Sequence, residues 1–201
     1  MAGTGKILAL DIGAGTQDIF LYDAGKKLEN CVKLVLPSPS ALMAERIRSL
    51  DAEKTAQGLF VGGYTVGGGS FSRAIKERLA TGTRVWMSRE AAFSLRNNLS
   101  DVEAMGVVVR DDPPPGFEGA VVRADEMDLG PLRYLLASVG ESLDDLDAAA
   151  VAVQDHGIYE TGESNRKTRL AHMKRRLEED PDPLSLSYLE GDIPATFPRM
   201  A

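Results

Sequence analysis

Three short apolar runs lie close together near the start of the chain, and their spacing constrains the fold more than any other feature. They cover residues 6–11, 17–23 and 32–36, and turn residues such as Gly13, Gly15 and Gly25 separate them. Strand-length runs joined by short turns are typical of antiparallel strands that pair in sequence order. The sequence therefore predicts an antiparallel meander over residues 6–36.

The following residues alternate between strand-like and helix-like patterns up to about residue 160. We predict helices at residues 41–54, 71–80, 88–96 and 131–139, and strands at 59–62, 84–87, 107–110, 120–123 and 147–154. Ser40 and Ser88 are the expected caps of the first and third of these helices. Strands alternating with helices indicate an α/β fold, and we expect one mixed sheet, antiparallel in its first three strands and parallel afterwards.

Two regions are expected from this pattern. Residues 1–160 form an α/β domain, in which residues 147–154 are an alanine- and valine-rich buried strand. Residues 161–201 form an arm or linker, with a polar helix over 166–180 and then four prolines.

Composition excludes several classes of partner. The net charge of −7 over 201 residues argues against nucleic acid, because phosphate backbones require a basic face. No apolar run is long enough to span a bilayer. The single cysteine, Cys31, cannot form an internal disulfide, is expected to be a buried structural thiol, and fits a cytoplasmic location.

The turn after the first apolar run is the leading candidate for a binding site. Asp11 ends the run, and the turn with its flank consists of Gly13, Ala14, Gly15, Thr16, Gln17 and Asp18. Glycine lets backbone N–H groups approach a phosphate closely, and Mg²⁺ takes one or two carboxylates together with water. Asp11 is thus the metal candidate, Thr16 adds a hydroxyl, and Asp18 can hold a water or brace the turn. The alternative is a plain β-hairpin.

Two further segments carry polar or glycine-rich signals. Gly67, Gly68 and Gly69 precede a predicted helix, whose N-terminus attracts anions, although glycine clusters are also common in flexible loops. The end of the strand over 147–154 is followed by chemically active side chains. Asp155 and His156 are candidates for a general base or metal ligand, and Gln154 for orienting a water; the alternative is an Asx turn beside a structural histidine.

The segment Asp11-Ile12-Gly13-Ala14-Gly15-Thr16-Gln17-Asp18 resembles the first phosphate motif of the actin, Hsp70 and sugar-kinase superfamily. That motif lies on the hairpin between the first two strands of a ribonuclease-H-like domain. The resemblance implies such a fold here, with ATP and Mg²⁺ as cofactors. It also implies that Asp11 serves the magnesium and that residues 13–16 contact the phosphates.

Further segments, residues 62–69, 152–157 and 164–166, look like a prokaryotic family of unknown function within that superfamily. Its members are often labelled pyruvate formate-lyase activating enzymes. Such an activator holds an iron–sulfur cluster on three cysteines, whereas this chain has only Cys31, so a radical mechanism is not expected.

Superfamily members place a second phosphate loop and an adenosine-binding glycine pair in a second half, and neither is found after residue 157. The resemblance therefore implies an N-terminal portion of a nucleotide-binding protein, an ATPase or phosphotransferase when complete, whose partner is a missing C-terminal half or a second copy. One alternative is a non-catalytic nucleotide-sensing or assembly module. Another is a hydrolase or metal-dependent enzyme that uses Asp155 and His156.

Overall fold

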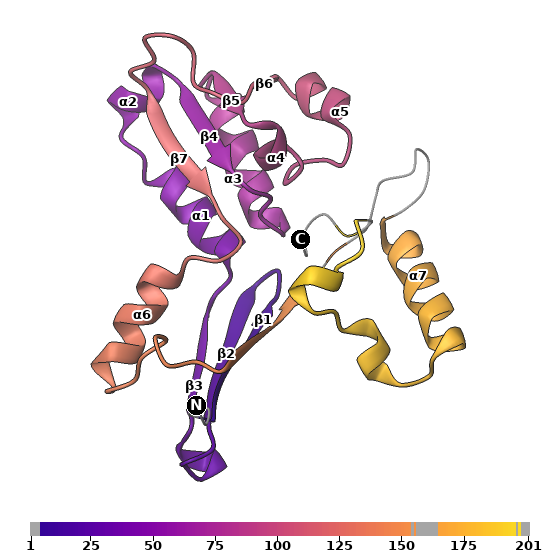
Figure 1. Cartoon of the computed structure of the whole chain (residues 1–201). Coiled ribbons are helices and arrows are strands. Elements are labelled where there is room, and N and C mark those ends of the chain that lie inside the picture. Colours follow the sequence, from indigo (N-terminus) through magenta and orange to yellow (C-terminus); the bar gives the residue numbers. More distant parts are fainter. Residues whose placement is uncertain (1–4, 154, 156–164, 196, 198–201) are drawn as a thin grey trace. The chain divides into compact units, whose positions relative to one another are not determined.

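The computed structural model describes residues 5–153, 155, 165–195 and 197, and it shows an α/β protein (Figure 1). The chain divides into two compact units, Met1–Ala152 and Val153–Ala201. The first unit contains two four-stranded sheets, and the second contains a long helix. Each unit is described below by itself.

The first sheet has the strand order β3-β2-β1-β8. Its strands are β1 (Lys6–Ile12), β2 (Thr16–Asp23), β3 (Val32–Pro37) and β8 (Ala148–Val153). β1, β2 and β3 are antiparallel neighbours, which confirms the predicted meander. The N–H of Asp147, directly before β8, donates to the carbonyl of Lys6 at 2.9 Å. β8 thus starts beside the start of β1 and runs in the same direction, so this sheet is mixed.

The second sheet is entirely parallel, with the order β6-β5-β4-β7. Its strands are β4 (Leu59–Gly63), β5 (Val85–Met87), β6 (Val107–Val109) and β7 (Ala120–Ala124). The expectation of one continuous mixed sheet is therefore wrong. The position beside β1 is taken by β8, so the strands from residue 59 to residue 124 pair among themselves.

Short helices connect the strands of the first unit. They are α1 (Pro39–Arg48), α2 (Ala52–Ala56), α3 (Gly69–Ala80), α4 (Arg89–Ala92), α5 (Leu99–Ala104) and α6 (Leu129–Ser138). The predicted helix over 41–54 is two helices, since Asp51 caps a new one. Ser38, not Ser40, caps α1, because Pro39 fits the first helical position and has no N–H to satisfy. Ser88 caps α4 as expected.

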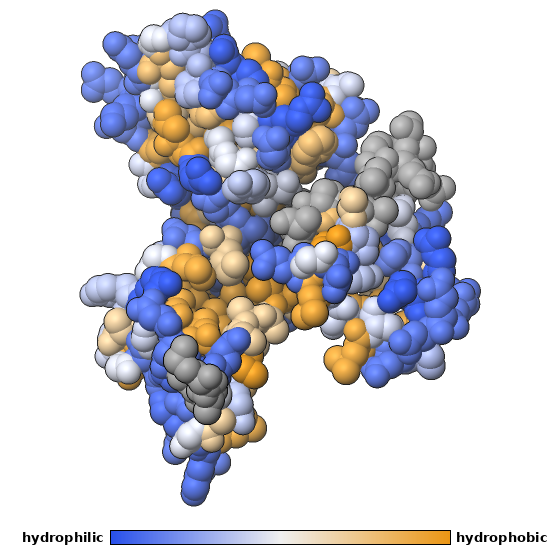
Figure 2. Space-filling view, viewed as in Figure 1, coloured by the Kyte–Doolittle hydropathy of each residue, from blue (hydrophilic) through white to orange (hydrophobic). Residues whose placement is uncertain are grey.

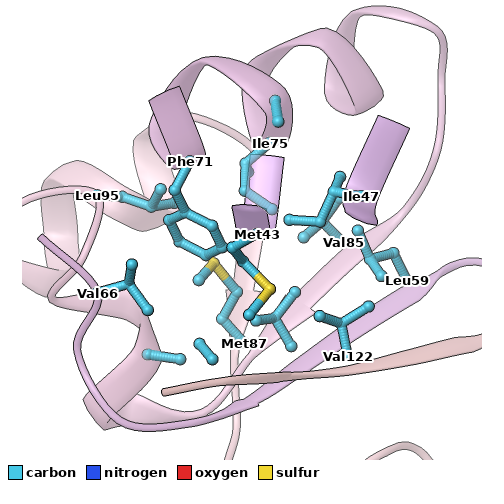
Figure 3. Packing of buried hydrophobic residues seen from close by; sticks show 14 of the residues in the cluster. Met43, Ile47, Leu59, Val66, Phe71, Ile75, Val85, Met87, Leu95 and Val122 are labelled. Carbon is cyan, nitrogen blue, oxygen red and sulfur yellow. The ribbon is translucent and has the colours of Figure 1, made fainter. Parts of the chain in front are cut away.

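The larger hydrophobic core lies between the parallel sheet and helices α1 and α3 (Figure 3). Met43 and Ile47 from α1 and Phe71 and Ile75 from α3 are buried in it. The sheet contributes the buried side chains of Leu59, Val61, Val85, Met87 and Val122. Trp86 on β5 is also buried, and its ring packs edge-to-face with that of Phe117, with centroids 5.3 Å apart.

A second, smaller core joins the mixed sheet to α6. Leu8, Leu10, Ile19 and Leu21 from β1 and β2 pack with α6 residues such as Leu132. These strand residues alternate in sequence, so one face of the mixed sheet covers this core and the other carries Asp11 and Asp18. Each of the two cores in the first unit is therefore built on its own sheet.

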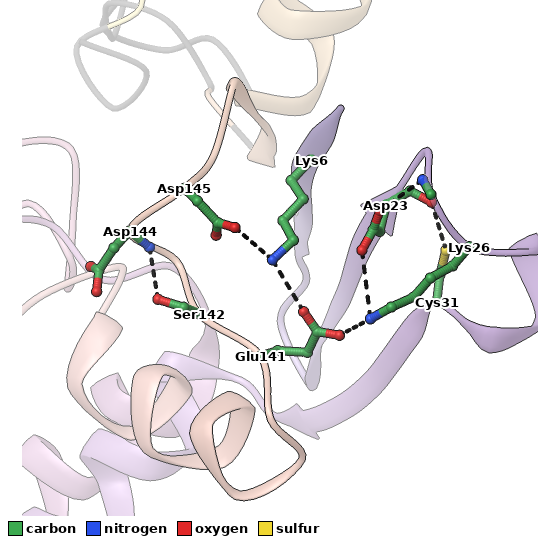
Figure 4. Close-up of polar contacts among 9 residues, drawn as sticks. Lys6, Asp23, Lys26, Cys31, Glu141, Ser142, Asp144 and Asp145 are labelled. Atoms are coloured by element: carbon green, nitrogen blue, oxygen red, sulfur yellow. Dashed lines mark hydrogen bonds and ion pairs between the residues drawn. The ribbon is translucent and has the colours of Figure 1, made fainter. Parts of the chain in front are cut away.

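An ion-pair network holds the segment after α6 against the mixed sheet (Figure 4). The carboxylate of Glu141 is buried and pairs with the ammonium groups of Lys6, at 3.4 Å, and of Lys26. Lys6 also pairs with Asp145 at 2.7 Å. The Lys26 ammonium, and after it Lys6, hold the pKa of Glu141 below its usual value despite burial. The network fixes the chain just before it enters β8.

The strand predicted over 147–154 exists, but its expected burial is wrong. The residues of β8 from Ala148 to Ala152 are exposed, and Val151 has 42% of its surface accessible. β8 is an edge strand, and edge strands lack a neighbour on one side. An alanine- and valine-rich run alone does not distinguish an edge strand from a central one.

The second unit contains α7 (Asn165–Glu179) and two 3₁₀ helices, Pro183–Leu186 and Glu190–Asp192. Phe197 packs its ring edge-to-face with His172 of α7, with centroids 4.6 Å apart. Burial, and after it the positive charges of Arg175 and Arg176, lower the pKa of His172. Across the described residues, none of the helices has the length and apolarity that a membrane span requires.

Candidate functional site

The turn between β1 and β2 is the centre of the candidate site. The N–H of Gly13 donates to the carbonyl of Thr16 at 2.9 Å, which closes the turn and leaves Ala14 and Gly15 exposed. Asp11 and Asp18 lie directly opposite each other in the β1–β2 register. Residues directly opposite have Cβ atoms about 4.5–5.5 Å apart, so both exposed carboxylates lie on one face of the hairpin.

Ser38, the cap of α1, connects this turn to a helix N-terminus. Its N–H donates to the carbonyl of Gly15 at 3.0 Å, and its hydroxyl donates to the carbonyl of Ala14 at 3.0 Å. The same hydroxyl accepts from the N–H of Ala41 at 3.1 Å. Ser38 is fully buried, so these bonds are shielded from water. The first residues of α1 are therefore held beside the glycine turn.

Gly68 brings the second glycine-rich segment to the same place. A Cβ atom on Gly68 would lie 2.9 Å from the Ser40 hydroxyl oxygen and 3.4 Å from the carbonyl oxygen of Ala14. Ser40 is buried, and its hydroxyl accepts from the N–H of Phe71 in the first turn of α3 at 3.2 Å. The structure thus brings together the turn at 13–16, the start of α1 and the start of α3.

The backbone N–H groups of this second segment differ in whether they have an acceptor within the protein. The N–H of Gly67 donates to the carboxylate of Glu126 at 2.7 Å. Gly69 and Ser70 begin α3, and N–H groups at the first positions of a helix have no acceptor within it. Among the described residues, the N–H groups of Gly69 and Ser70 are therefore candidates for contact with an anion at this end of α3.

Glu126 is a site residue that sequence reasoning missed. It follows β7 by two residues, next to β4 at the carboxyl end of the parallel sheet, where α/β proteins place functional side chains. This topological position is the only signal that identifies it, and the strand pairing had to be known first.

Among the described residues, no group of three or more His, Cys, Asp and Glu side chains is arranged around a common metal position. Asp11 and Asp18 supply two carboxylates, and Thr16 donates its hydroxyl to Asp18 at 3.4 Å. Mg²⁺ is commonly held by one or two carboxylates with phosphate oxygens and several waters. The donor set at the turn therefore fits this ion. Gln17, the remaining residue of the predicted segment, donates its amide to the carbonyl of Pro37 at 3.0 Å.

The three residues predicted at the end of the strand over 147–154 belong to the second unit. Asp155 is buried. Gln154 and His156 lie outside the described residues. Their roles as general base, metal ligand or water-orienting group stay predictions.

Fold and site together define an α/β protein with a polar site lined by glycines. The site lies at the C-terminal end of β1 and at the N-terminal ends of helices α1 and α3. Residues 66–201 match a family model described as "Putative pyruvate format-lyase activating enzyme (DUF1786)". The chain belongs to this family, which is a domain family of unknown function. No curated protein and no solved structure matches the chain.

Proposed function

We propose that this chain binds a nucleotide, ATP in the first place, through its phosphates and a Mg²⁺ ion at the turn between β1 and β2. The observation that carries the proposal is the meeting of residues 13–16 with Gly68, more than fifty positions away in sequence. The two glycine-rich segments then meet beside the first residues of α1 and α3. Helix N-termini favour anions through their unpaired N–H groups and their dipoles.

The opposed carboxylates support the magnesium part of the proposal. Like charges directly opposite each other in a sheet are destabilising, so Asp11 and Asp18 repel each other until a cation lies between or beside them. In the proposed complex Asp11 serves the metal directly. Asp18 holds one of its waters, and the turn with Gly69 and Ser70 receives the phosphates. The ion supplies neutralisation of the phosphoryl charge, and the chain supplies position.

The mixed sheet supports a ribonuclease-H-like fold of the actin, Hsp70 and sugar-kinase superfamily. The sheet has three antiparallel strands, and after a helix a further strand lies parallel beside β1. The resemblance implies this arrangement. In this proposal residues 39–128, with the parallel sheet, are inserted between β3 and α6. The site is then one side of a cleft, and its other side comes from a second lobe or a second copy, where ATPase or phosphotransferase activity arises.

The test is the affinity of the full chain for ATP, measured by calorimetry with and without Mg²⁺. Asp11→Asn keeps the shape of the side chain and removes its charge, and we expect a loss of about tenfold or more with Mg²⁺ present. Asp112→Asn changes an exposed aspartate in the loop after β6 and is the matched control. Equal Mg²⁺-dependent affinities of Asp11→Asn and wild type overturn the metal assignment. Phosphate release with Mg²⁺ then separates an enzyme from a nucleotide-sensing or assembly module, which binds without turnover.

A further inference from the structure

A cavity of about 140 Å³ lies on the other side of the same two strands. Its walls come from β1 and β2, from α1, and from the segment that enters α6. Leu10 and Ile19 form its floor, Leu42 lies on the α1 side, and Leu129 and Leu132 lie on the α6 side. Hydrophobic side chains gather over α6 and the neighbouring strands in Figure 2, and Leu42 and Leu129 are among the exposed ones, at 49% and 36%.

This cavity is separate from the proposed nucleotide site. Successive residues of a strand point to opposite faces, so Leu10 and Ile19 face away from Asp11 and Asp18. A ligand in the cavity therefore does not contact those carboxylates. Gln17 lines the cavity and directly precedes Asp18, so the two sites share the hairpin but not its face.

Arg46 is the cationic side chain of the cavity lining. It is an exposed residue of α1 that lines the cavity, and its guanidinium has no ion pair or side-chain hydrogen bond within residues 5–153, 155, 165–195 and 197. The two acids at the rim are already engaged. Asp125 pairs with Arg123 at 2.9 Å, and Asp128 accepts from the N–H of Gly130 at the start of α6. Arg46 is thus the charged side chain of the lining that has neither an ion pair nor a side-chain hydrogen bond among the described residues, and it can take an acidic partner.

We propose that this cavity binds a small amphipathic anion, with a compact apolar body inside and a carboxylate on Arg46. The volume sets the size of the apolar part, because an apolar cavity of about 150 Å³ accepts a benzene ring. A guanidinium pairs with a carboxylate in a two-pronged geometry, which fixes the orientation of the bound molecule. A short-chain fatty acid or an aromatic acid has both parts.

In this cavity a ligand contacts residues of both cores of the first unit. Met43, which lines it, belongs to the core of the parallel sheet, whereas Leu132 belongs to the core of the mixed sheet. A molecule that contacts both walls stabilises the folded state by an amount that grows with the logarithm of its concentration above the Kd. Binding is therefore read out as increased stability as well as by direct titration.

Hexanoate is the probe, and hexanamide and hexylamine are its neutral and cationic analogues. Saturation-transfer NMR and calorimetry on the full chain give the three affinities. We expect hexanoate to bind more tightly than both analogues, and Arg46→Gln to weaken it by about fivefold or more without changing hexanamide. Leu42→Gln, at a half-exposed position, is expected to weaken both hexanoate and hexanamide. Arg73→Gln removes an exposed cation from α3, outside the cavity lining, and is the matched control.

Three outcomes overturn the proposal. They are no detectable hexanoate binding by the wild type, hexanoate binding that Arg46→Gln leaves unchanged, and tighter binding of hexylamine than of hexanoate. A further measurement shows which of the two sites binds hexanoate. If the cavity is the site, Asp11→Asn leaves the affinity for hexanoate unchanged. Loss of hexanoate binding in that variant assigns the probe to the turn and also overturns the proposal.

Discussion

Replacing Gly68 by alanine tests the contact on which the candidate site depends. Gly68 has φ +107° and ψ 157°, a conformation that is open to glycine and strained for other residues. Holding an L-residue there costs about 1–3 kcal/mol. The added Cβ atom would also lie 2.9 Å from the Ser40 hydroxyl oxygen, which is closer than such atoms approach each other in proteins.

The second cost follows from what Ser40 does. If its hydroxyl moves away, it weakens the hydrogen bond that it accepts from the N–H of Phe71 at 3.2 Å, and such a bond contributes about 1 kcal/mol. Together the two effects predict a loss of about 2–4 kcal/mol in the free energy of unfolding for Gly68→Ala. In a chain of this size that lowers the melting temperature by about 5–15 °C.

The neighbouring glycine provides the control. Gly69 is the first residue of α3, and no atom lies within 4 Å of the Cβ position there. Alanine is also preferred to glycine inside helices, by about 0.5–1 kcal/mol, so Gly69→Ala should be neutral or stabilising. Urea unfolding followed by the fluorescence of Trp86, the single and buried tryptophan, reports directly on the first unit.

A double-mutant cycle makes the test specific. In a Ser40→Ala background the hydroxyl is absent, so Gly68→Ala should cost about 1 kcal/mol less than in the wild type. Equal stabilities of Gly68→Ala and Gly69→Ala would refute the strained conformation and with it the close approach of the two glycine segments. An unchanged cost of Gly68→Ala in the Ser40→Ala background would refute the role of the serine alone.

Three other predictions concern single contacts of the fold. Glu141→Gln should destabilise the chain by about 1 kcal/mol at neutral pH, because its two lysine partners lose their shared carboxylate. Since the pKa of Glu141 is lowered on folding, this stabilisation is present above pH 4.5 and lost as the pH falls through the folded value, so urea midpoints of variant and wild type should converge in acid. The pKa of His172 should lie below 6.5 by NMR titration, and Phe197→Leu should raise it, because the ring of Phe197 packs on the imidazole. As the pH falls below 6.5, the histidine of the unfolded chain takes up a proton before that of the folded chain. The free energy of unfolding of the second unit should therefore fall in this range. Arg78→Ala should lower the free energy of unfolding in urea by about 1–2 kcal/mol, because its guanidinium donates to three carbonyls at the end of α1. A loss no larger than that caused by Arg73→Gln would contradict this role.

The local elements of this fold were predictable because their signals are local. The three strands of the meander and the turn at 13–16 follow from apolar runs of strand length and from glycine between them. The cap of α1 was misplaced by two residues, since both Ser38 and Ser40 precede the apolar positions. The presence of Pro39 was the deciding feature, because proline suits the first position of a helix.

Strand pairing was not predictable in the same way, because partners lie far apart in sequence. β4 pairs with β7, which starts at Ala120, and β1 pairs with β8, which starts at Ala148. A run of apolar residues indicates a strand but contains no information about its neighbour. For the same reason Glu126 was missed, since its link to Gly67 exists only once β4 and β7 are adjacent.

The chain passes between its two sheets twice in the first unit, and both passages are tied to the candidate site. The first, residues 37–39 after β3, is bonded to the turn through Ser38. The second, residues 125–128 after β7, is bonded to the start of α3 through Glu126 and also lines the cavity. A phosphate at the turn and an acid in the cavity would therefore each act on the same two passages from opposite faces of the hairpin. Coupling between two ligands requires a shared element whose arrangement both of them influence, and under the two proposals these two passages are the candidates for that element.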